Sequence, residues 1–597
     1  MTTPAKRAPA DKVRQLREAV RAFQHEAVSK QGMQLLRQFP GDPSILTCLA
    51  HSALALGDRD RALYFARDAE RAAPGDPSMI AHTAHILGVM GQLEEAEQKF
   101  IRVLDMRPND ANFTQGLVAV MVAQRRHADV ERKCRECLAR MPNDAKLVTT
   151  LAYALTCLNQ YDEAVRVLER AAPSHPTDIF LHNQWCFNIH HLPDASPAQV
   201  RAVHEAFNAV LERVEPSKPV TFTQTPDPER RIRIGIVSPD LITNVVATFI
   251  EPVFAHRDSS RYELYAYMTR PNEDEVTARL RAMTDVWRNA SAVTQRQLGQ
   301  RLRDDHLDVI IDLAGHSKGF NLAALHLRPA PVQATYLGYA GTTGVHAIGY
   351  RIVDSITDPP GDSDTHTVEK LIRLDPCFIC FTPPPDAPEV AARPADAPIT
   401  FGSFNAVRKI NQQVVALWAR VLREVPGSRL LLKSFDLADQ QTQDNLRARF
   451  VAEGVDGARV LTLKPLAPMR DHLGQYAEVD IALDPFPYNG TTTTCEAMWM
   501  GVPVVTKIGD RHAARVGASL LHAAELPDLI ANDDAAYVAI AASLARDHAR
   551  RAELRARLRE QMRTSILMNQ PAFAARFYDV VRTMWREWCA GQSRPTA

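Results

Sequence analysis

The chain has 597 residues, which is enough for roughly three or four domains of ordinary size. Its 70 basic and 70 acidic side chains balance, so net charge gives no support to a nucleic-acid or membrane-surface role. It has no run of about 18 apolar residues, no signal-peptide core in residues 1–14, and nine scattered cysteines. We therefore expect a reduced, cytoplasmic protein without a membrane span.

The first third of the chain carries a strict repeat. Prolines recur every 34 residues, at Pro40, Pro74, Pro108, Pro142 and Pro176. This period is typical of tetratricopeptide (TPR) repeats, helix–turn–helix units that a proline closes. Gly57 and Gly91 mark the turn inside a repeat, where a positive φ is convenient. We expect four full repeats over about 43–176, a degenerate repeat before them and a capping helix pair after them, so that the array fills residues 1–214.

Stacked repeats of this kind curl into a superhelix with a concave groove. The functional interpretation is that the groove binds a partner protein or peptide, and the alternative is a purely architectural arm. Two Cys-x-x-Cys pairs, Cys134/Cys137 and Cys377/Cys380, have no histidine at zinc-finger spacing. We interpret both pairs as packing residues.

Residues 215–230 are rich in Pro and Thr and read as a linker. Short apolar runs then alternate with helical segments, which indicates parallel strands buried on both faces. The expected strands are 232–238, 263–269, 309–315, 333–338 and 350–354 in one half, and 399–404, 429–434, 460–464, 479–484 and 502–507 in the other. The sequence thus predicts two doubly wound α/β domains, 231–385 and 399–597, joined by a Pro/Ala-rich linker at 386–398, with a ligand cleft at the strand ends.

The segment 484–505, DPFPYNGTTTTCEAMWMGVPVV, is the most informative one. A strand ends, a Pro/Gly turn follows, and four threonines lead into a helix from about Thr493. Hydroxyls and free N–H groups at a helix N-terminus form an anion site, so we expect a nucleotide diphosphate here. Glu496 lies one turn into the helix and can accept hydrogen bonds from a ribose. The alternative is that threonine simply caps the helix.

Other polar residues follow other strands. Lys409 comes after the first strand of the second half and could neutralise a diphosphate, and His472 follows a later strand. In the first half, Asp240, the GHSKG segment around Lys318 and the LGYAGTTG turn also follow strands, which indicates one shared site edge. A lone Asp362-Ser-Asp364 tripeptide in that half could suggest a metal, but such tripeptides are common by chance, and we predict no metal site.

Taken together, these segments give the chain a family resemblance. TPR repeats followed by GHSKG, RPAPVQATYLGYAGTTG, DPFPYNGTTTTCEAMWMGVPVVT and GDRHAARVGASLL resemble the bacterial O-linked N-acetylglucosaminyltransferases. That glycosyltransferase family also contains the nucleocytoplasmic O-GlcNAc transferase and the Spindly-type O-fucosyltransferases. The resemblance covers essentially the whole chain. It implies a GT-B fold and a metal-independent, inverting transfer from a sugar nucleotide, usually UDP-GlcNAc, to Ser or Thr of a protein.

The resemblance also implies roles for individual residues. Lys409 would contact the diphosphate, His472 the uridine and Glu496 the ribose, and Lys318 would lie near the leaving group. Asp240 matches an aspartate proposed to take part in proton transfer. The remaining residues would hold the phosphates (Thr491, Thr492 and Thr493) or line the sugar pocket (Leu337, Gly338 and Gly341).

Three positions depart from the family pattern. Asn244 stands where relatives carry a histidine, and an amide cannot titrate near neutral pH, so donor identity or turnover is open. Ala340 replaces a proline in the glycine-rich turn. The asparagine ladder that grips peptide in the animal enzyme is absent, because position 6 of the repeats holds Cys48, His82, Gly116 and Thr150.

Two alternatives therefore stay open beside protein O-GlcNAc transfer. One is a related transferase that uses GDP-fucose or UDP-glucose. The other is a TPR scaffold whose transferase half binds nucleotide but turns over little. In either case we expect protein or peptide partners in the groove, no cofactor beyond the sugar nucleotide, no nucleic acid, and a possible homo-oligomer.

Overall fold

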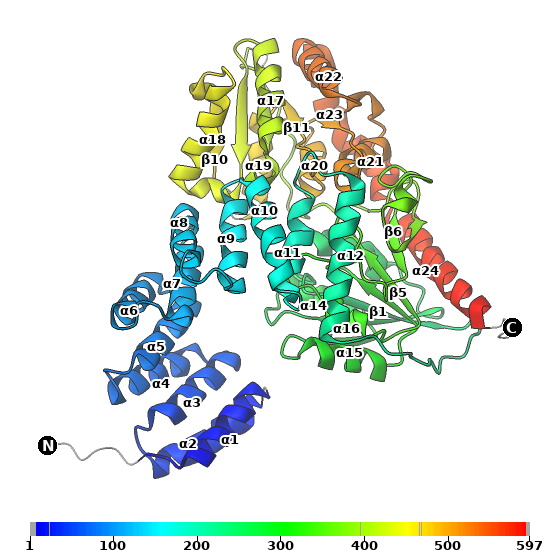
Figure 1. Ribbon diagram of the computed structural model, residues 1–597. Helices are drawn as coiled ribbons and strands as arrows, with labels where there is room; N and C mark the ends of the chain where they lie inside the picture. The colour runs from blue at the N-terminus through cyan, green and yellow to red at the C-terminus, as the bar shows by residue number, and fades with distance from the viewer. Residues whose placement is uncertain (1–6, 23, 395, 465, 467, 593–597) are drawn as a thin grey trace. The chain divides into compact units, whose positions relative to one another are not determined.

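The computed structural model describes residues 7–22, 24–394, 396–464, 466 and 468–592 (Figure 1). The chain forms two compact units, one ending at Leu158 and the other beginning at Asn159. Among the described helices, none is long and apolar enough to cross a bilayer.

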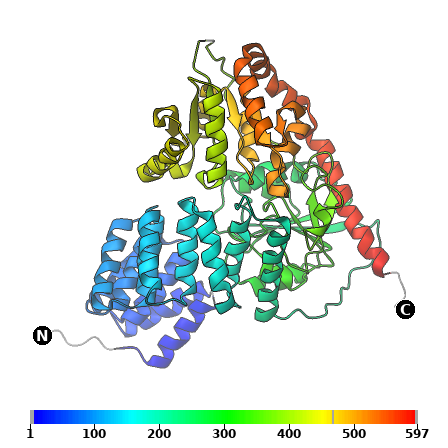
Figure 2. The ribbon, with the colours of Figure 1, turned by 45° about the horizontal axis from the view of Figure 1, so that its top comes forward.

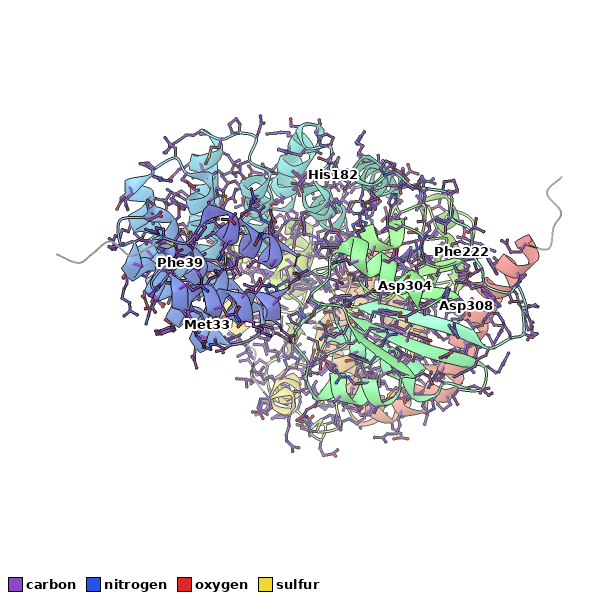
Figure 3. The ribbon with its side chains drawn as sticks, turned by 90° about the horizontal axis from the view of Figure 1, so that it is seen from below. Met33, Phe39, His182, Phe222, Asp304 and Asp308 are labelled. Carbon is purple, nitrogen blue, oxygen red and sulfur yellow. The ribbon has the colours of Figure 1, made fainter. Side chains whose placement is uncertain are left out.

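The first unit is built of helices that pack in consecutive pairs. These helices are α1 (Ala10–Arg21), α2 (His25–Gln38), α3 (Pro43–Ala55), α4 (Arg59–Ala72), α5 (Pro77–Val89), α6 (Leu93–Met106), α7 (Ala111–Ala123), α8 (His127–Leu138) and α9 (Ala145–Cys157). Phe39 closes the core between the first pairs, and Met33 packs partly buried against that core (Figure 3). The predicted repeat helices are confirmed, including the degenerate pair α1–α2.

The repeat period has a local physical cause. An aspartate two residues after each closing proline caps the next helix: Asp42 accepts from Ser44 N at 2.9 Å, and Asp76 accepts from Ser78 N at 2.8 Å. Asp110 caps α7 by accepting from Asn112 N, and Asp144 caps α9 by accepting from Leu147 N. A carboxylate at this position satisfies first-turn N–H groups that otherwise lack partners, so each Pro-x-Asp restarts the array.

The turn between the two helices of a repeat is equally regular. It takes a positive φ at residues spaced by 34: Gly57 (83°), Gly91 (82°), Arg125 (60°) and Asn159 (63°). The expectation for the two glycines is confirmed, and the conformation extends to two residues with side chains. The packing of the third repeat accounts for the glycine at position 116. A Cβ there would lie 2.3 Å from Cε1 of the Phe100 ring. An asparagine at position 116 would overlap the Phe100 ring, so the packing of this repeat excludes the asparagine that the ladder of the animal enzyme would need here.

The second unit begins with three helices, of which α11 and α12 pack against its first sheet and α10 packs on α11. These are α10 (Tyr161–Ala171), α11 (Ile179–Ile189) and α12 (Pro197–Val214), with the 3-10 turn η1 (Ala172–Ser174) after α10. Cys186 and Phe207 share one hydrophobic cluster with Tyr267 and Ile310 of the sheet. Figure 2 shows α11 and α12 beside the first sheet, with His182 of α11 labelled in Figure 3. The last helices of the repeat region therefore pack as part of the α/β unit.

The first sheet has seven strands, all parallel, in the order β3-β2-β1-β4-β5-β6-β7. Its strands are β1 (Ile232–Ser238), β2 (Tyr262–Met268), β3 (Val286–Asn289), β4 (Val309–Asp312), β5 (Val332–Tyr336), β6 (Tyr350–Val353) and β7 (Lys370–Arg373). Its helices are α13 (Val245–Ala255), α14 (Glu275–Ala282), α15 (Gln295–Asp304) and α16 (Leu322–His326), with η2 at Ser363–Thr365. The order reverses between β1 and β4, and ligands bind open α/β sheets at such switch points.

The second sheet has six parallel strands in the order β10-β9-β8-β11-β12-β13. Its strands are β8 (Thr400–Ser403), β9 (Arg429–Lys433), β10 (Val460–Leu463), β11 (Ile481–Leu483), β12 (Val504–Lys507) and β13 (Ile530–Ala531). Its α-helices are α17 (Gln412–Glu424), α18 (Gln440–Ala452), α19 (Met469–Gly474), α20 (Thr492–Trp499), α21 (Val516–Ala523), α22 (Asp534–Arg546), α23 (His548–Thr564) and α24 (Gln570–Gln592). Its short 3-10 turns are η3 (Val407–Lys409), η4 (Phe435–Ala438), η5 (Gly457–Arg459), η6 (Gln475–Glu478), η7 (His512–Ala514), η8 (Pro527–Leu529) and η9 (Ile566–Met568). The switch point here lies between β8 and β11.

All ten predicted strands are present, and β1 has the predicted bounds. Strands β3, β7 and β13 were not predicted from the sequence. These strands lie at sheet edges, where one side is unpaired, and they read VWRN, KLIR and IA rather than continuous apolar runs. Apolar content identifies strands buried on both faces, so it does not find such edge strands.

The C-terminal helix α24 joins the two halves of the second unit. It follows the second half in sequence but packs on the first, where Tyr578 Oη donates to Val253 O at 2.7 Å (Figure 1). Arg582 Nη1 donates to Pro228 O and Arg230 O at 2.8 and 2.7 Å. The linker is also fastened to the first sheet, because Arg230 Nη1 donates to Asp308, labelled in Figure 3, at 2.8 Å.

Candidate active site

The threonine-rich segment forms a tight loop after β11. Asp484, the first residue after the strand, is buried and accepts hydrogen bonds from Gly490 N and from Thr506 Oγ1, both at 2.7 Å. A Cβ on Gly490 would lie 2.6 Å from Thr493 Oγ1, so only glycine fits this turn. Burial raises the pKa of the Asp484 carboxyl to about 7.

The N-terminus of α20 keeps its polar groups available. Helix α20 begins at Thr492, one residue earlier than predicted, and its N-cap residue Thr491 makes no side-chain capping bond. Thr493 Oγ1 donates to Asn405 Oδ1 at 3.0 Å rather than to the helix backbone. Neither Thr491 nor Thr493 caps the helix with its side chain, so the simple N-cap interpretation does not describe them. The first-turn N–H groups can therefore bind an anion.

Lys409 lies against the same loop. Its Nζ donates to Asn489 O at 2.7 Å, lies 3.4 Å from Asn405 Oδ1 and sits 4.8 Å from the centroid of the Tyr488 ring. Burial lowers the pKa of Lys409 to about 8, while the nearby Asp484 opposes that shift. The cation that the sequence placed beside a diphosphate is thus adjacent to the threonine loop, at the β8–β11 switch point.

A second cluster lies one helical turn further along α20. Glu496 is buried, and its carboxylate accepts from His472 Nε2 at 3.3 Å and from Tyr476 Oη at 3.5 Å. Lys433, at the end of β9, donates from Nζ to His472 O at 2.9 Å. His472 and Glu496, which were predicted to serve uridine and ribose, are therefore in contact, and Lys433 is a neighbour that the sequence analysis missed.

In the first half, the predicted residues follow β1 and β4 on either side of its switch point. Asn244 Nδ2 donates to Asp240 Oδ1 at 3.1 Å, and Asn244 Oδ1 caps α13 by accepting from Val246 N at 3.1 Å. Burial raises the pKa of Asp240, and the cations of Arg270 and Lys318 oppose this. The asparagine that replaces the family histidine thus holds Asp240 in place and begins a helix.

The glycine-rich turn after β5 has constrained geometry. Leu337 takes a φ of 71°, which is costly for a residue with a side chain and is a feature that clusters at functional sites. A Cβ on Gly338 would lie 1.8 Å from Leu313 O, and one on Gly341 would lie 2.4 Å from the ring of His190. The turn therefore packs backbone against backbone beside the GHSKG segment, and Lys318 in that segment is exposed.

Two further histidines come from the end of α11 and were missed. The His191 ring stacks on Tyr488 of the threonine loop at 4.8 Å and on Tyr161 at 4.6 Å. His190 is buried against Tyr339, with ring centroids 5.2 Å apart. The adjacent histidines just before Leu192-Pro193 were the sequence signal for this contact. They were not predicted as site residues because the 34-residue repeat assigned positions 190–191 to the helical array.

The absence of a metal site stays a prediction. Among the residues that the structure describes, Cys186, His204 and His316 bring one ligand atom each within 4.8 Å of one another. Both histidines already use their ring nitrogens: His204 with Val200 O and Tyr339 Oη, and His316 with Asn183 Oδ1 and Thr343 O. The group is therefore occupied by the protein's own hydrogen bonds.

The other metal-like patterns also have partners within the protein. In the Asp-x-Asp tripeptide, Asp364 pairs with Arg373 at 3.0 Å. Both Cys-x-x-Cys pairs are buried free thiols, in line with the packing interpretation.

A pocket of about 680 Å³ opens beside β12 and β13. Its lining includes Phe486, Lys507, Arg511 and Asp534, and none of the predicted site residues is among the lining residues. Lys507 Nζ lies 3.5 Å from the Phe486 ring centroid and pairs with Asp534 at 2.7 Å. The candidate site is thus defined by its side chains at the switch points rather than by this pocket.

TPR helices followed by two parallel α/β domains, with an open helix N-terminus and a half-buried lysine at one switch point, define a GT-B glycosyltransferase fold. The model of glycosyl transferase family 41 matches residues 194–381 and 389–577, and a tetratricopeptide model matches residues 121–182. The chain belongs to glycosyl transferase family 41.

One curated relative and one solved structure illustrate the similarity. The chain is 40% identical over 376 residues to the Arabidopsis thaliana protein named probable UDP-N-acetylglucosamine–peptide N-acetylglucosaminyltransferase SPINDLY. That match covers 61% of this chain and 41% of the relative, so the chain matches about two fifths of its length. A solved structure of a mutant Thermobaculum terrenum O-GlcNAc transferase superposes with a TM-score of 0.75 at 32% identity, covering 92% of this chain and 98% of that one.

Proposed function

We propose that the chain is a protein O-glycosyltransferase that moves GlcNAc from UDP-GlcNAc to Ser or Thr of protein acceptors, with inversion and without a metal ion. The observation that carries the proposal is the N-terminus of α20, where Thr491 leaves the first turn uncapped and Lys409 adds a cation. The names of the Arabidopsis and Thermobaculum relatives support the donor and the acceptor.

In this proposal the diphosphate of the donor binds Thr491, Thr492 and Thr493 at the helix start, and Lys409 balances its charge. Glu496 accepts from the ribose hydroxyls, and His472 contacts the uracil. As the bond to the sugar breaks, negative charge grows on the leaving diphosphate. Fixed positive groups that meet growing charge give the largest single contribution to many enzymatic rates, so Lys409 is the residue with the most to contribute.

The first half supplies the sugar and acceptor end. Leu337, Gly338 and Gly341 line the sugar pocket, and Lys318 lies near the leaving group. An acceptor hydroxyl attacks the anomeric carbon in line with the departing UDP, in one displacement with no covalent enzyme intermediate. Asp240 is the group that can take the hydroxyl proton, because burial raises its pKa and so makes it a stronger base than an exposed aspartate.

Asn244 has a supporting role in this scheme. Its amide cannot accept a proton near neutral pH, but it holds the Asp240 carboxylate through a 3.1 Å hydrogen bond. In the absence of the family histidine, Asp240 would therefore accept the proton, and Asn244 would orient its carboxylate.

We also propose that the TPR groove presents acceptor proteins and that the enzyme works in the cytoplasm, where its nine cysteines would stay reduced. Without the asparagine ladder, acceptors would be held by side chains other than those of the animal enzyme. A possible homo-oligomer remains part of the expectation.

A donor panel tests the proposal. Purified protein is incubated with UDP-GlcNAc, GDP-fucose or UDP-glucose and a Ser/Thr peptide library, and nucleotide release and peptide mass are measured. UDP release with gain of an N-acetylhexosamine supports the proposal. Transfer of a deoxyhexose or hexose would favour a related transferase that uses GDP-fucose or UDP-glucose. Nucleotide binding without release would favour the TPR scaffold with little turnover, the alternative that Asn244 supports.

A further inference from the structure

Lys433 is a buried lysine that the proposed reaction leaves without a role. It is the last residue of β9, beside β8 in the second sheet, and its side chain is 1% exposed. Its Nζ donates one hydrogen bond, to His472 O at 2.9 Å, and lies 4.1 Å from the Phe404 ring centroid and 5.9 Å from that of Tyr476. A carbonyl and two aromatic faces therefore hold the cation.

This environment is unusual for an ammonium group. Lysines are almost never fully buried unless they are paired. In the described part of the chain, no carboxylate forms an ion pair with Lys433, and Glu496 acts on it only at longer range. Burial lowers the pKa of Lys433 to about 7, while Glu496 opposes the shift. A strand end that keeps such a costly group is a candidate for a functional role.

Lys433 lies beside both residues that contact Glu496, namely His472 and Tyr476. The carbonyl it binds belongs to His472, whose imidazole contacts Glu496 at 3.3 Å. The same Nζ lies 5.9 Å from the ring centroid of Tyr476, whose hydroxyl contacts the same carboxylate at 3.5 Å. Lys433 thus hydrogen-bonds one of the two residues that contact Glu496 and lies beside the other, while its own side chain is buried.

We propose that Lys433 is a positioning residue for the nucleoside part of the donor: it fixes the main chain at His472 and balances Glu496, so that both side chains are set before the nucleotide binds. The assignment rests on the proposed function. It predicts that Lys433 affects the nucleoside end of the donor and leaves the diphosphate end unchanged.

The two ends can be separated by ligand. Isothermal titration calorimetry with UMP and UDP measures affinity for the wild type, Lys433→Met and Lys433→Arg. Lys507→Met is the matched control, since Lys507 also ends a strand of this sheet above an aromatic ring but pairs with Asp534 outside the cluster. Lys409→Met serves as the comparison at the diphosphate end.

We expect Lys433→Met to weaken UMP and UDP equally, by roughly tenfold, as the loss of a hydrogen bond from a charged donor predicts. Lys433→Arg should restore most of the affinity, and Lys507→Met should bind like the wild type. Lys409→Met should weaken UDP more than UMP. A folded Lys433→Met protein with wild-type affinity for both nucleotides overturns the assignment, as does a loss confined to UDP.

A second measurement covers the case in which Lys433→Met does not fold. The groups that face Lys433 are Glu496, His472 and Tyr476, and all three are shared by the wild type and Lys433→Arg. The ratio of UDP affinities, wild type over Lys433→Arg, should fall as pH rises from 6.5 to 8.5, because lysine loses its charge with a pKa of about 7 and arginine does not.

A ratio that stays constant with pH overturns the assignment. If the wild type binds neither UDP nor GDP, the proposed function fails and the role of Lys433 fails with it. Nucleotide binding by the wild type with no effect of either Lys433 variant removes the role of Lys433 alone.

Discussion

Replacing Lys409 by methionine removes one positive charge from the threonine loop while keeping the length of the side chain. The Nζ group lies 2.7 Å from Asn489 O, between the loop and the end of β8, so the substitution deletes a cation at the place where the diphosphate is expected. We expect transfer to be lost and the fold to be kept.

The loss of rate can be sized from the chemistry of the site. Removing one preorganised donor from a developing anion costs about 100- to 1000-fold in rate, and Lys409 supplies a full charge as well as a donor. We therefore expect kcat/KM to fall at least about 1000-fold, which is roughly 4 kcal/mol of transition-state stabilisation.

The expected effect on stability is smaller, because of Asp484. Burial already raises the pKa of this carboxyl to about 7 beside Lys409. Without the cation its pKa rises further, so the carboxyl takes up a proton and no uncompensated charge is left buried. The melting temperature of Lys409→Met should therefore stay within a few degrees of the wild type.

The assay is nucleotide release from the preferred donor with a peptide library, with Lys507→Met as the lysine-to-methionine control and the thermal melt as the check on folding. A folded Lys409→Met enzyme that keeps more than about a tenth of the wild-type kcat/KM would refute the reasoning, because it would mean that no significant charge grows beside Lys409.

Three further outcomes are expected. Asn244→Ala should lower stability by about 1 kcal/mol in thermal denaturation through loss of the α13 cap, and should lower kcat because Asp240 loses its 3.1 Å partner; unchanged kcat would contradict that positioning role. Gly91→Ala should cost about 1 kcal/mol because φ is 82° there, whereas Gly75→Ala, where a Cβ also meets nothing within 4 Å but φ is not positive, should be neutral; equal effects would contradict the strain argument. UDP binding at pH 8.5 should take up protons, because burial lowers the pKa of Lys409 to about 8 and a bound diphosphate raises it again; equal enthalpies in buffers of different ionisation enthalpy would contradict this.

Much of the architecture followed from the sequence because its signals are local and periodic. The 34-residue prolines located the repeats, and the aspartate two residues after each proline explains why the period is strict. Buried parallel strands are continuous apolar runs, so ten of them were found. Polar residues after strands converge at switch points in any doubly wound sheet, which is why Lys409 and Thr493 could be grouped before their contacts were known.

The remaining features depend on contacts that a linear sequence does not carry. Lys433 reads as an ordinary residue at the end of LLLK, and only the fold buries it beside His472 and Glu496. His191 belongs by sequence to the repeat region, yet its ring stacks on Tyr488 of the threonine loop. Gly116 replaces the asparagine of the animal enzyme because the Phe100 ring fills the space beside it, and only the structure shows where that ring lies.

The central claim is that the charge at the start of α20 serves transfer of a sugar to protein. The most direct test incubates wild type and Lys409→Met with UDP-GlcNAc and a Ser/Thr peptide library, and determines peptide masses. The proposal predicts peptides heavier by one N-acetylhexosamine with the wild type and none with the folded variant. Equal modification by both proteins, or none by a wild type that binds UDP, would contradict it.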